Sequence, residues 1–246
     1  MPKKILWSIL IILVLGFYLL PQAKATAQQS DPGGRSSRFD YELRTDPLIR
    51  SLNILRQTAN RVDANSKTLV GAYLKTTRWY ESESKRLSDN PFKLAYFEAA
   101  LRHLDQHSNL IPNQKIQCIG FAILLHSLSD LFPAIGGSEI YYAKDLVPDA
   151  IKNGNAKKVD LGDYSALVIT KIEEVNVGDF ILRYDSNVGH ISGVIGKKTV
   201  DGKIVLLVAT GNQVRDGKIQ IFEVDENNFE VIFGSAPFKK VIFRNN

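Results

Sequence analysis

The sequence of 246 residues predicts an α+β fold, with helices first along the chain and antiparallel strands second. Up to about residue 135, apolar residues recur every three or four positions, as in helices that pack one face on a core. From about residue 166 they come in short runs separated by turn residues such as Asp201-Gly202, which is typical of strands. The sequence contains no Gly-rich phosphate loop, zinc signature or internal repeat.

The N-terminal segment has the three parts of an export leader. A basic start (Lys3-Lys4) precedes an apolar run from Ile5 to Leu20, and Ala23 to Ala27 offers small residues at cleavage spacing. The run is long for a signal peptide and short for a membrane span, which needs about 20 residues. Residues 1–27 are therefore a signal peptide or an uncleaved N-terminal anchor, and both alternatives stay open. In either case we expect an extracytoplasmic protein that is secreted, periplasmic or associated with the cell wall, with residues 28–44 as a flexible tether.

Residues 45–110 are predicted to form a helical region. Thr45-Asp46-Pro47 is a helix start, an apolar stripe runs through 67–87, and Asn90-Pro91 opens a third helix. His103 and His107 lie one turn apart near the end of the third helix, but no acidic or cysteine partner follows at ligand spacing. Because cations are favoured at a helix C-terminus, we interpret this pair as structural and expect neither a metal nor any other cofactor.

The chain's single cysteine, Cys118, opens a helix that is apolar almost all round as far as Phe132, and such a helix is buried. A helix N-terminus stabilises a thiolate, so Cys118 is a candidate nucleophile; the alternative is a small core residue. One cysteine cannot form a disulfide within its own chain, and an exported thiol is open to oxidation. The expected compartment therefore favours a reactive thiol.

The second half of the chain predicts a helix over 138–146 and then a series of strands. The expected strands cover 166–170, 179–184, 190–195, 203–209, 218–224, 229–233 and 240–243.

A thiol nucleophile needs a base within hydrogen-bond reach. His126 lies eight residues after Cys118 on the same helix, about 12 Å along its axis, which is too far to take the proton. His190 follows a short loop and opens an apolar strand, and Gly189 and Gly193 beside it permit close approach of another element. His190 is therefore the candidate base.

Three motifs in order carry a resemblance: Gln117-Cys118 at a buried helix, Val177-Gly178-Asp179-Phe180-Ile181, and the run from Gly189-His190 to Gly196. Together they resemble the CHAP and NlpC/P60 branch of the papain-like cysteine peptidases, over about residues 112–243. The resemblance implies a papain-like domain at 111–246, with the cysteine-bearing helix packed on an antiparallel sheet.

The resemblance also implies a third catalytic residue on the strand after that of the histidine. Asn212 is the first choice, to hold the imidazole in its tautomer, and Thr210 and Gln213 are the alternates. For the oxyanion we expect the backbone N–H of Cys118, with Gln114 or Gln117 as side-chain donors. The chain departs from the family at Ile119-Gly120, where the family often has an aromatic or acidic residue after its cysteine.

These features predict an exported amide hydrolase acting on peptidoglycan or another cell-envelope peptide, by thiolate attack from Cys118. The resemblance leaves open cleavage within the stem peptide or release of the peptide from the glycan. An inactive binding or scaffold protein with the same fold, or a thiol acyltransferase, are the alternatives. The formal net charge of +5 falls to +2 without residues 1–27, because Lys3, Lys4 and Lys24 leave with no acidic residue. Nucleic acid is therefore not an expected partner, and the membrane is one only through residues 5–20 if the leader is retained.

Overall fold

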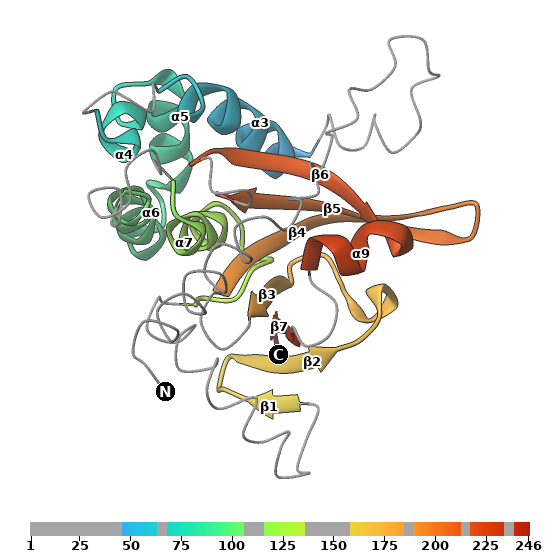
Figure 1. Cartoon of the computed structure of the whole chain (residues 1–246). Coiled ribbons are helices and arrows are strands. Elements are labelled where there is room, and N and C mark those ends of the chain that lie inside the picture. Colours follow the sequence, from blue (N-terminus) through green and yellow to red (C-terminus); the bar gives the residue numbers. More distant parts are fainter. Residues whose placement is uncertain are drawn as a thin grey trace, which may run out of the picture. The chain divides into compact units, whose positions relative to one another are not determined.

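A computed structural model describes residues 46–62, 68–105, 116–135, 158–184, 189–212, 217–233 and 239–246 (Figure 1). The helices are α3 (Pro47–Ala59), α4 (Val70–Leu74), α5 (Arg78–Leu87), α6 (Pro91–His103), α7 (Cys118–Leu128) and α9 (Glu226–Phe233), with a 3₁₀ turn at Ile172–Glu174. The strands are β1 (Lys158–Asp160), β2 (Tyr164–Ile169), β3 (Phe180–Tyr184), β4 (Gly189–Val200), β5 (Lys203–Gly211), β6 (Ile219–Asp225) and β7 (Lys239–Asn245). The α+β prediction is confirmed.

Several predictions fall outside the described residues. These are the leader (1–27), the tether (28–44), the helix at 138–146, the division at 110/111, and the residues Gln114, Gln213 and His107. Within the described ranges, no helix has both the length and the apolar character that crossing a bilayer demands.

The helix starts follow from capping side chains. Asp46 Oδ1 accepts from the backbone N–H of Leu48 at 2.8 Å and of Ile49 at 3.1 Å, which satisfies two donors that the first turn leaves over. The stripe predicted through 67–87 is divided into α4 and α5, because Thr77 donates its hydroxyl to Leu74 O at 2.6 Å and caps α5. This local bond ends one helix and begins the next.

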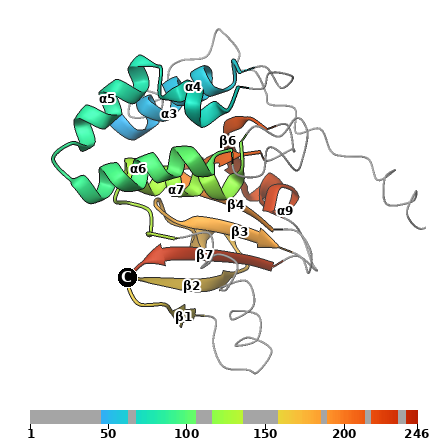
Figure 2. The same cartoon turned by 90° about the vertical axis from the view of Figure 1, so that its left-hand side faces the viewer.

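The seven strands form one antiparallel sheet in the order β1-β2-β7-β3-β4-β5-β6 (Figure 2). One face packs on α3 to α7 through a hydrophobic cluster that includes Phe121, Phe180 and Ala209. The other face packs on α9 through a second cluster that includes Val194, Val208 and Phe233. Successive residues of a strand therefore belong alternately to the α7 face and the α9 face.

The strand predicted at 229–233 is wrong, because these residues belong to α9. Asp225 Oδ1 accepts from the N–H of Asn227 at 3.0 Å and of Asn228 at 3.1 Å, while Asn228 Oδ1 accepts from Asp225 N at 2.8 Å. This reciprocal arrangement is a capping box. Phe229 and Phe233, four residues apart, then lie on one helical face and are both buried.

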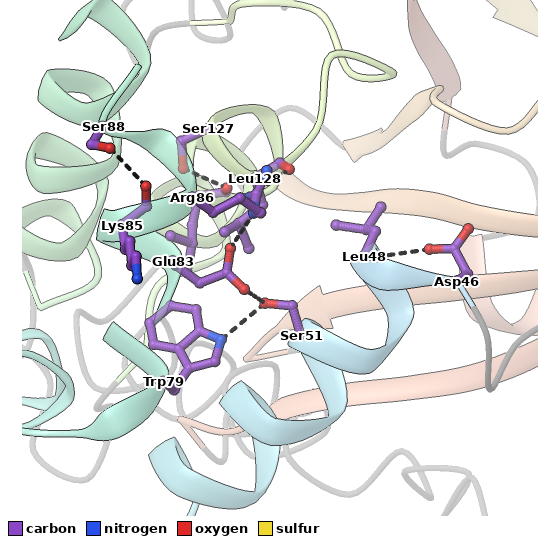
Figure 3. Close-up of polar contacts among 11 residues, drawn as sticks. Asp46, Leu48, Ser51, Trp79, Glu83, Lys85, Arg86, Ser88, Ser127 and Leu128 are labelled. Atoms are coloured by element: carbon purple, nitrogen blue, oxygen red, sulfur yellow. Dashed lines mark hydrogen bonds and ion pairs between the residues drawn. The ribbon is translucent and has the colours of Figure 1, made fainter. Parts of the chain in front are cut away.

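The helical region is joined to the sheet rather than attached by a linker alone. The side chain of Asn60, after α3, makes two hydrogen bonds of 2.9 Å with the N–H and C=O of Ile219 on β6. Buried Glu83 in α5 accepts from Ser51 Oγ and from Arg86 Nε, each at 2.7 Å (Figure 3). Arg86 also donates to Leu128 O at the end of α7, so α3, α5 and α7 share one polar network.

The Gly178-Asp179 motif is a structural element of this fold. Gly178 has φ of +91°, and a Cβ there would stand 2.5 Å from Leu131 O. The fully buried Asp179 carboxylate accepts from Arg244 Nε and Nη2 and from Asn176 N, each at 2.7 Å. The motif thereby ties the start of β3 to β7.

Candidate functional site

The first turn of α7 is held tightly against α6. Gln117 donates its N–H to Leu104 O at 3.1 Å, and a Cβ on Gly120 would lie 2.5 Å from His103 O. Only glycine permits this approach. Close packing of α7 on α6 therefore explains the glycine at position 120.

β4 and β5 cease to be paired close to this turn. Their ladder begins at Ser192 and Thr210, whereas Gly211 pairs with Ile219 on β6. We call this place, between residues 189–191 and residues 211–212, the fork. Gly211 faces α7, because a Cβ there would lie 2.8 Å from Ile116 Cγ2 and 2.9 Å from Phe121 Cβ.

The backbone N–H of Ile191 points into the fork. Val194 bonds to Gly178 and Asp179 on the β3 side, through its C=O and its N–H respectively. Along an antiparallel strand, the backbone N–H and C=O groups of successive residues point alternately to the two neighbouring strands. The backbone groups of Ser192 and His190 therefore also point to β3, and those of Ile191 point toward β5. In a continued ladder, Ile191 N–H would bond to Gly211.

The Cys118 sulfur lies near this N–H, because the backbone of Ile191 is one of the groups that act on the pKa of the thiol. The thiol is half-buried, and burial raises its pKa above the ordinary value, while backbone hydrogen bonds from Ile191, Ile119 and Cys118 itself act in the lowering direction. Burial is the larger effect. The sulfur thus enters the fork from the α7 face and rests as a neutral thiol.

The imidazole of His190 reaches the same fork from the other face of the sheet. Gly193 faces α7, since a Cβ there would lie 2.5 Å from Leu125 Cδ1, so His190, three residues before it, faces α9. Its partner across β3, Arg183, donates to Ile232 O in α9 at 3.2 Å, which agrees with this assignment. Cys118 and His190 therefore converge on the fork from opposite faces of β4.

On β5, the strand that follows β4, the residue in hydrogen-bond contact with His190 is Thr210. His190 Nε2 lies 2.7 Å from Thr210 Oγ1, and Ser192 Oγ lies 3.2 Å from the same oxygen. Asn212, the first choice from sequence, has φ of +64° and accepts from Gly217 N at 2.9 Å through Oδ1. It holds the turn toward β6, at the rim of the fork.

Gln117, one of the two candidate oxyanion donors, precedes Cys118 directly. Its Nε2 is buried and has no hydrogen-bond partner among the residues that the structure describes. A buried amide donor without a partner costs about 1–3 kcal/mol, so such a group is expected where a ligand oxygen supplies the acceptor.

Two features of the site were missed by sequence reasoning: the Ile191 N–H and the Ser192 hydroxyl. A signal for Ser192 was present, since a hydroxyl two residues after His190 shares its face of the strand. In the described ranges, no group of three His, Cys, Asp or Glu side chains has the arrangement of a metal site.

No protein-family model matches the chain, and neither a curated protein nor a solved structure matches it.

Proposed function

We propose that the protein is an exported, papain-like amide hydrolase that acts on peptidoglycan or a related cell-envelope peptide, with Cys118 as nucleophile and His190 as base. The observation that carries this proposal is the fork. The thiol at the start of α7 lies near the backbone of Ile191, which acts on its pKa, and His190 directly precedes Ile191 in the sequence. A candidate nucleophile and a candidate base from distant parts of the chain thus flank one peptide unit, from opposite faces of β4, and this supports the proposed pairing.

In this mechanism the proton of the Cys118 thiol passes to Nδ1 of His190, because Nε2 is engaged with Thr210. The sulfur attacks the amide carbonyl carbon, and the C=O electrons move to the oxygen. Gln117 Nε2 and the backbone N–H of Cys118 are the donors proposed for that oxygen. The tetrahedral intermediate then expels the amine, which takes the proton from the imidazolium. Water, deprotonated by His190, hydrolyses the thioester and regenerates the thiol.

The proposed step requires the thiol and the imidazole to meet through the fork, since they approach from opposite faces. Such a pair exchanges its proton during attack rather than resting as thiolate and imidazolium. The raised pKa of Cys118 supports this neutral resting state. Alkylation of Cys118 by iodoacetamide at pH 7 should then be slower than that of an exposed cysteine in a peptide.

The same raised pKa favours the second candidate, a cell-envelope binding protein that keeps the fold without turnover. In that case Cys118 closes the fork as a packing residue, and His190, Thr210 and Ser192 form a buried polar cluster that stabilises the ends of β4 and β5.

The experiment that separates the two uses the full chain in mild detergent with purified peptidoglycan, beside Cys118→Ala and His190→Gln. Released fragments are identified by mass. We expect fragments from the wild type alone, and their masses identify the bond that is cut. Equal release from the wild type and Cys118→Ala would refute the hydrolase. Retention of all three proteins on peptidoglycan without release would favour the binding protein.

A further inference from the structure

Three basic side chains lie side by side on the α9 face, in a row that crosses three strands. Arg183 on β3 is the register partner of His190 on β4 and of Lys240 on β7. His190 and Arg183 face α9, and Lys240 does so too, because its Nζ lies 5.5 Å from the ring centroid of Phe229 in α9. We call these three residues the basic row.

The basic row interrupts a surface that is otherwise largely apolar, with side chains such as Val194 and Val208 in the cluster under α9. His190 is 9% exposed and Lys240 is 6% exposed. Like charges directly opposite one another on neighbouring strands destabilise a sheet, and a charge withdrawn from water needs a partner of opposite sign. A row of this kind therefore favours the presence of anionic groups.

The second half of α9 supplies acceptors to two members of the row. Lys240 Nζ lies 2.8 Å from Glu230 Oε1. Arg183 Nη1 donates to Ile232 O at 3.2 Å, and this carbonyl carries no net charge. An ammonium group has three N–H donors and a guanidinium has five. Both groups are therefore suited to hold more than one acceptor at a time.

We propose that Arg183 and Lys240 of the basic row form a subsite for a carboxylate of the substrate, with Arg183 as the main donor; this inference rests on the proposed function. A planar guanidinium binds a carboxylate through two parallel hydrogen bonds. Neighbouring strands are about 4.8 Å apart, and consecutive Cα atoms of a peptide are about 3.8 Å apart. A carboxylate on Arg183 therefore belongs to a residue close to the amide that reacts at His190.

The basic row lies at an end of the sheet that solvent reaches. Gly189, directly before His190, is exposed, and the side chain of Glu230 is 48% exposed. If the row served only to fasten α9 to the sheet, the charge of a ligand would not affect its binding. A comparison of a carboxylate with the matching neutral amide therefore separates a subsite from a purely structural role.

The test measures binding of N-acetyl-D-alanine and of N-acetyl-D-alaninamide to the full chain in mild detergent. The chain has four histidines, so ¹⁵N-histidine labelling gives few NMR signals, and His190→Gln identifies the signal that reports on the row. We expect the carboxylate to bind at least about tenfold more tightly than the amide, as hydrogen bonds to a charged group imply. Arg183→Met and Lys240→Met should each remove most of this preference. Arg78→Met makes the same change at an exposed position of α5 and should leave it as in the wild type.

Release of fragments from peptidoglycan is the second readout. The wild type should cut native peptidoglycan about tenfold faster than peptidoglycan whose free carboxylates have been converted to amides, because only the first carries the group that Arg183 binds. Arg183→Met should cut both at one low rate. A variant that is slow but still prefers the native polymer would show that Arg183 acts on the structure and not on the carboxylate.

The two proposals fail in distinguishable ways. Equal or undetectable binding of the two probes by the wild type overturns the subsite, whatever the activity, and tighter binding of inorganic phosphate than of N-acetyl-D-alanine overturns its assignment to a carboxylate. A wild type that prefers the carboxylate but releases no fragments overturns the hydrolase and keeps the binding site. If Arg183→Met does not fold without its bond to α9, Lys240→Met decides, and an undiminished preference for the carboxylate in that variant overturns the subsite.

Discussion

Arg244→Met removes the cation that neutralises a carboxylate at the centre of the sheet. Arg244 donates two hydrogen bonds of 2.7 Å to Asp179, whose side chain is 0% exposed. Methionine keeps much of the aliphatic length of arginine, so the packing loss is small. Asp179 would retain the N–H of Asn176 at 2.7 Å but would lose its counter-charge.

Because Asp179 is fully buried and Arg244 is 31% exposed, the expected cost is at most about 3–5 kcal/mol, the range for leaving a buried charge without its partner. For a domain of this size, each kcal/mol lowers Tm by about 2–4 °C, so the expected fall is roughly 6–20 °C. Lys198→Met is the matched control. Lys198 pairs with Glu223 at 2.7 Å, but that glutamate is 53% exposed, and the expected loss is at most about 1 kcal/mol.

Both variants are compared with the wild type by urea unfolding followed by circular dichroism. The double variant Asp179→Leu with Arg244→Met removes both charges and should be more stable than Arg244→Met alone. If Arg244→Met loses no more stability than Lys198→Met, the Asp179–Arg244 pair does not hold β3 to β7. The structural role assigned to the Gly178-Asp179 motif would then be wrong.

Three further predictions concern stability. Because burial raises the pKa of Cys118, its protonated form is favoured in the folded state. The free energy of unfolding should therefore fall as pH rises above the ordinary thiol pKa. Urea titrations at several pH values should show this slope in the wild type and not in Cys118→Ala. Gly120→Ala should cost about 1–3 kcal/mol by overpacking against His103 O, read as a lower urea midpoint; an unchanged midpoint would mean that α6 and α7 can separate. Asp225→Ala should cost about 1 kcal/mol by loss of the α9 cap, and equal stability of Asp225→Ala and wild type in thermal unfolding would contradict the cap.

The parts of the fold that local chemistry determines were predictable from sequence. Asp46 and Asn90 cap the helices that they were expected to start, and most strands lie near the expected runs. The segment 229–233 was predicted as a strand because its apolar residues suit a strand and a helix equally well. The decisive signal was the Asp225/Asn228 capping box just before it.

The sequence named candidate site residues but could not predict their geometry. Cys118 starts α7 as expected, since the apolar run that follows requires a buried helix. The face on which His190 lies depends on the register between β3 and β4, where Arg183 is its partner, and register is set by pairing of distant segments. For the same reason, the sequence could not predict that Thr210 contacts His190 while Asn212 holds the turn toward β6.

The two edges of the sheet are protected from addition of further strands by different means. At β6, the amide of Asn60 uses both hydrogen-bonding groups of Ile219, as a neighbouring strand would. At the other edge, β1 is only three residues long and carries Lys158 and Asp160, which are exposed. Open edges recruit strands from other molecules. Loss of the Asn60 amide would therefore have its main effect on self-association, which Asn60→Ala should reveal as concentration-dependent light scattering.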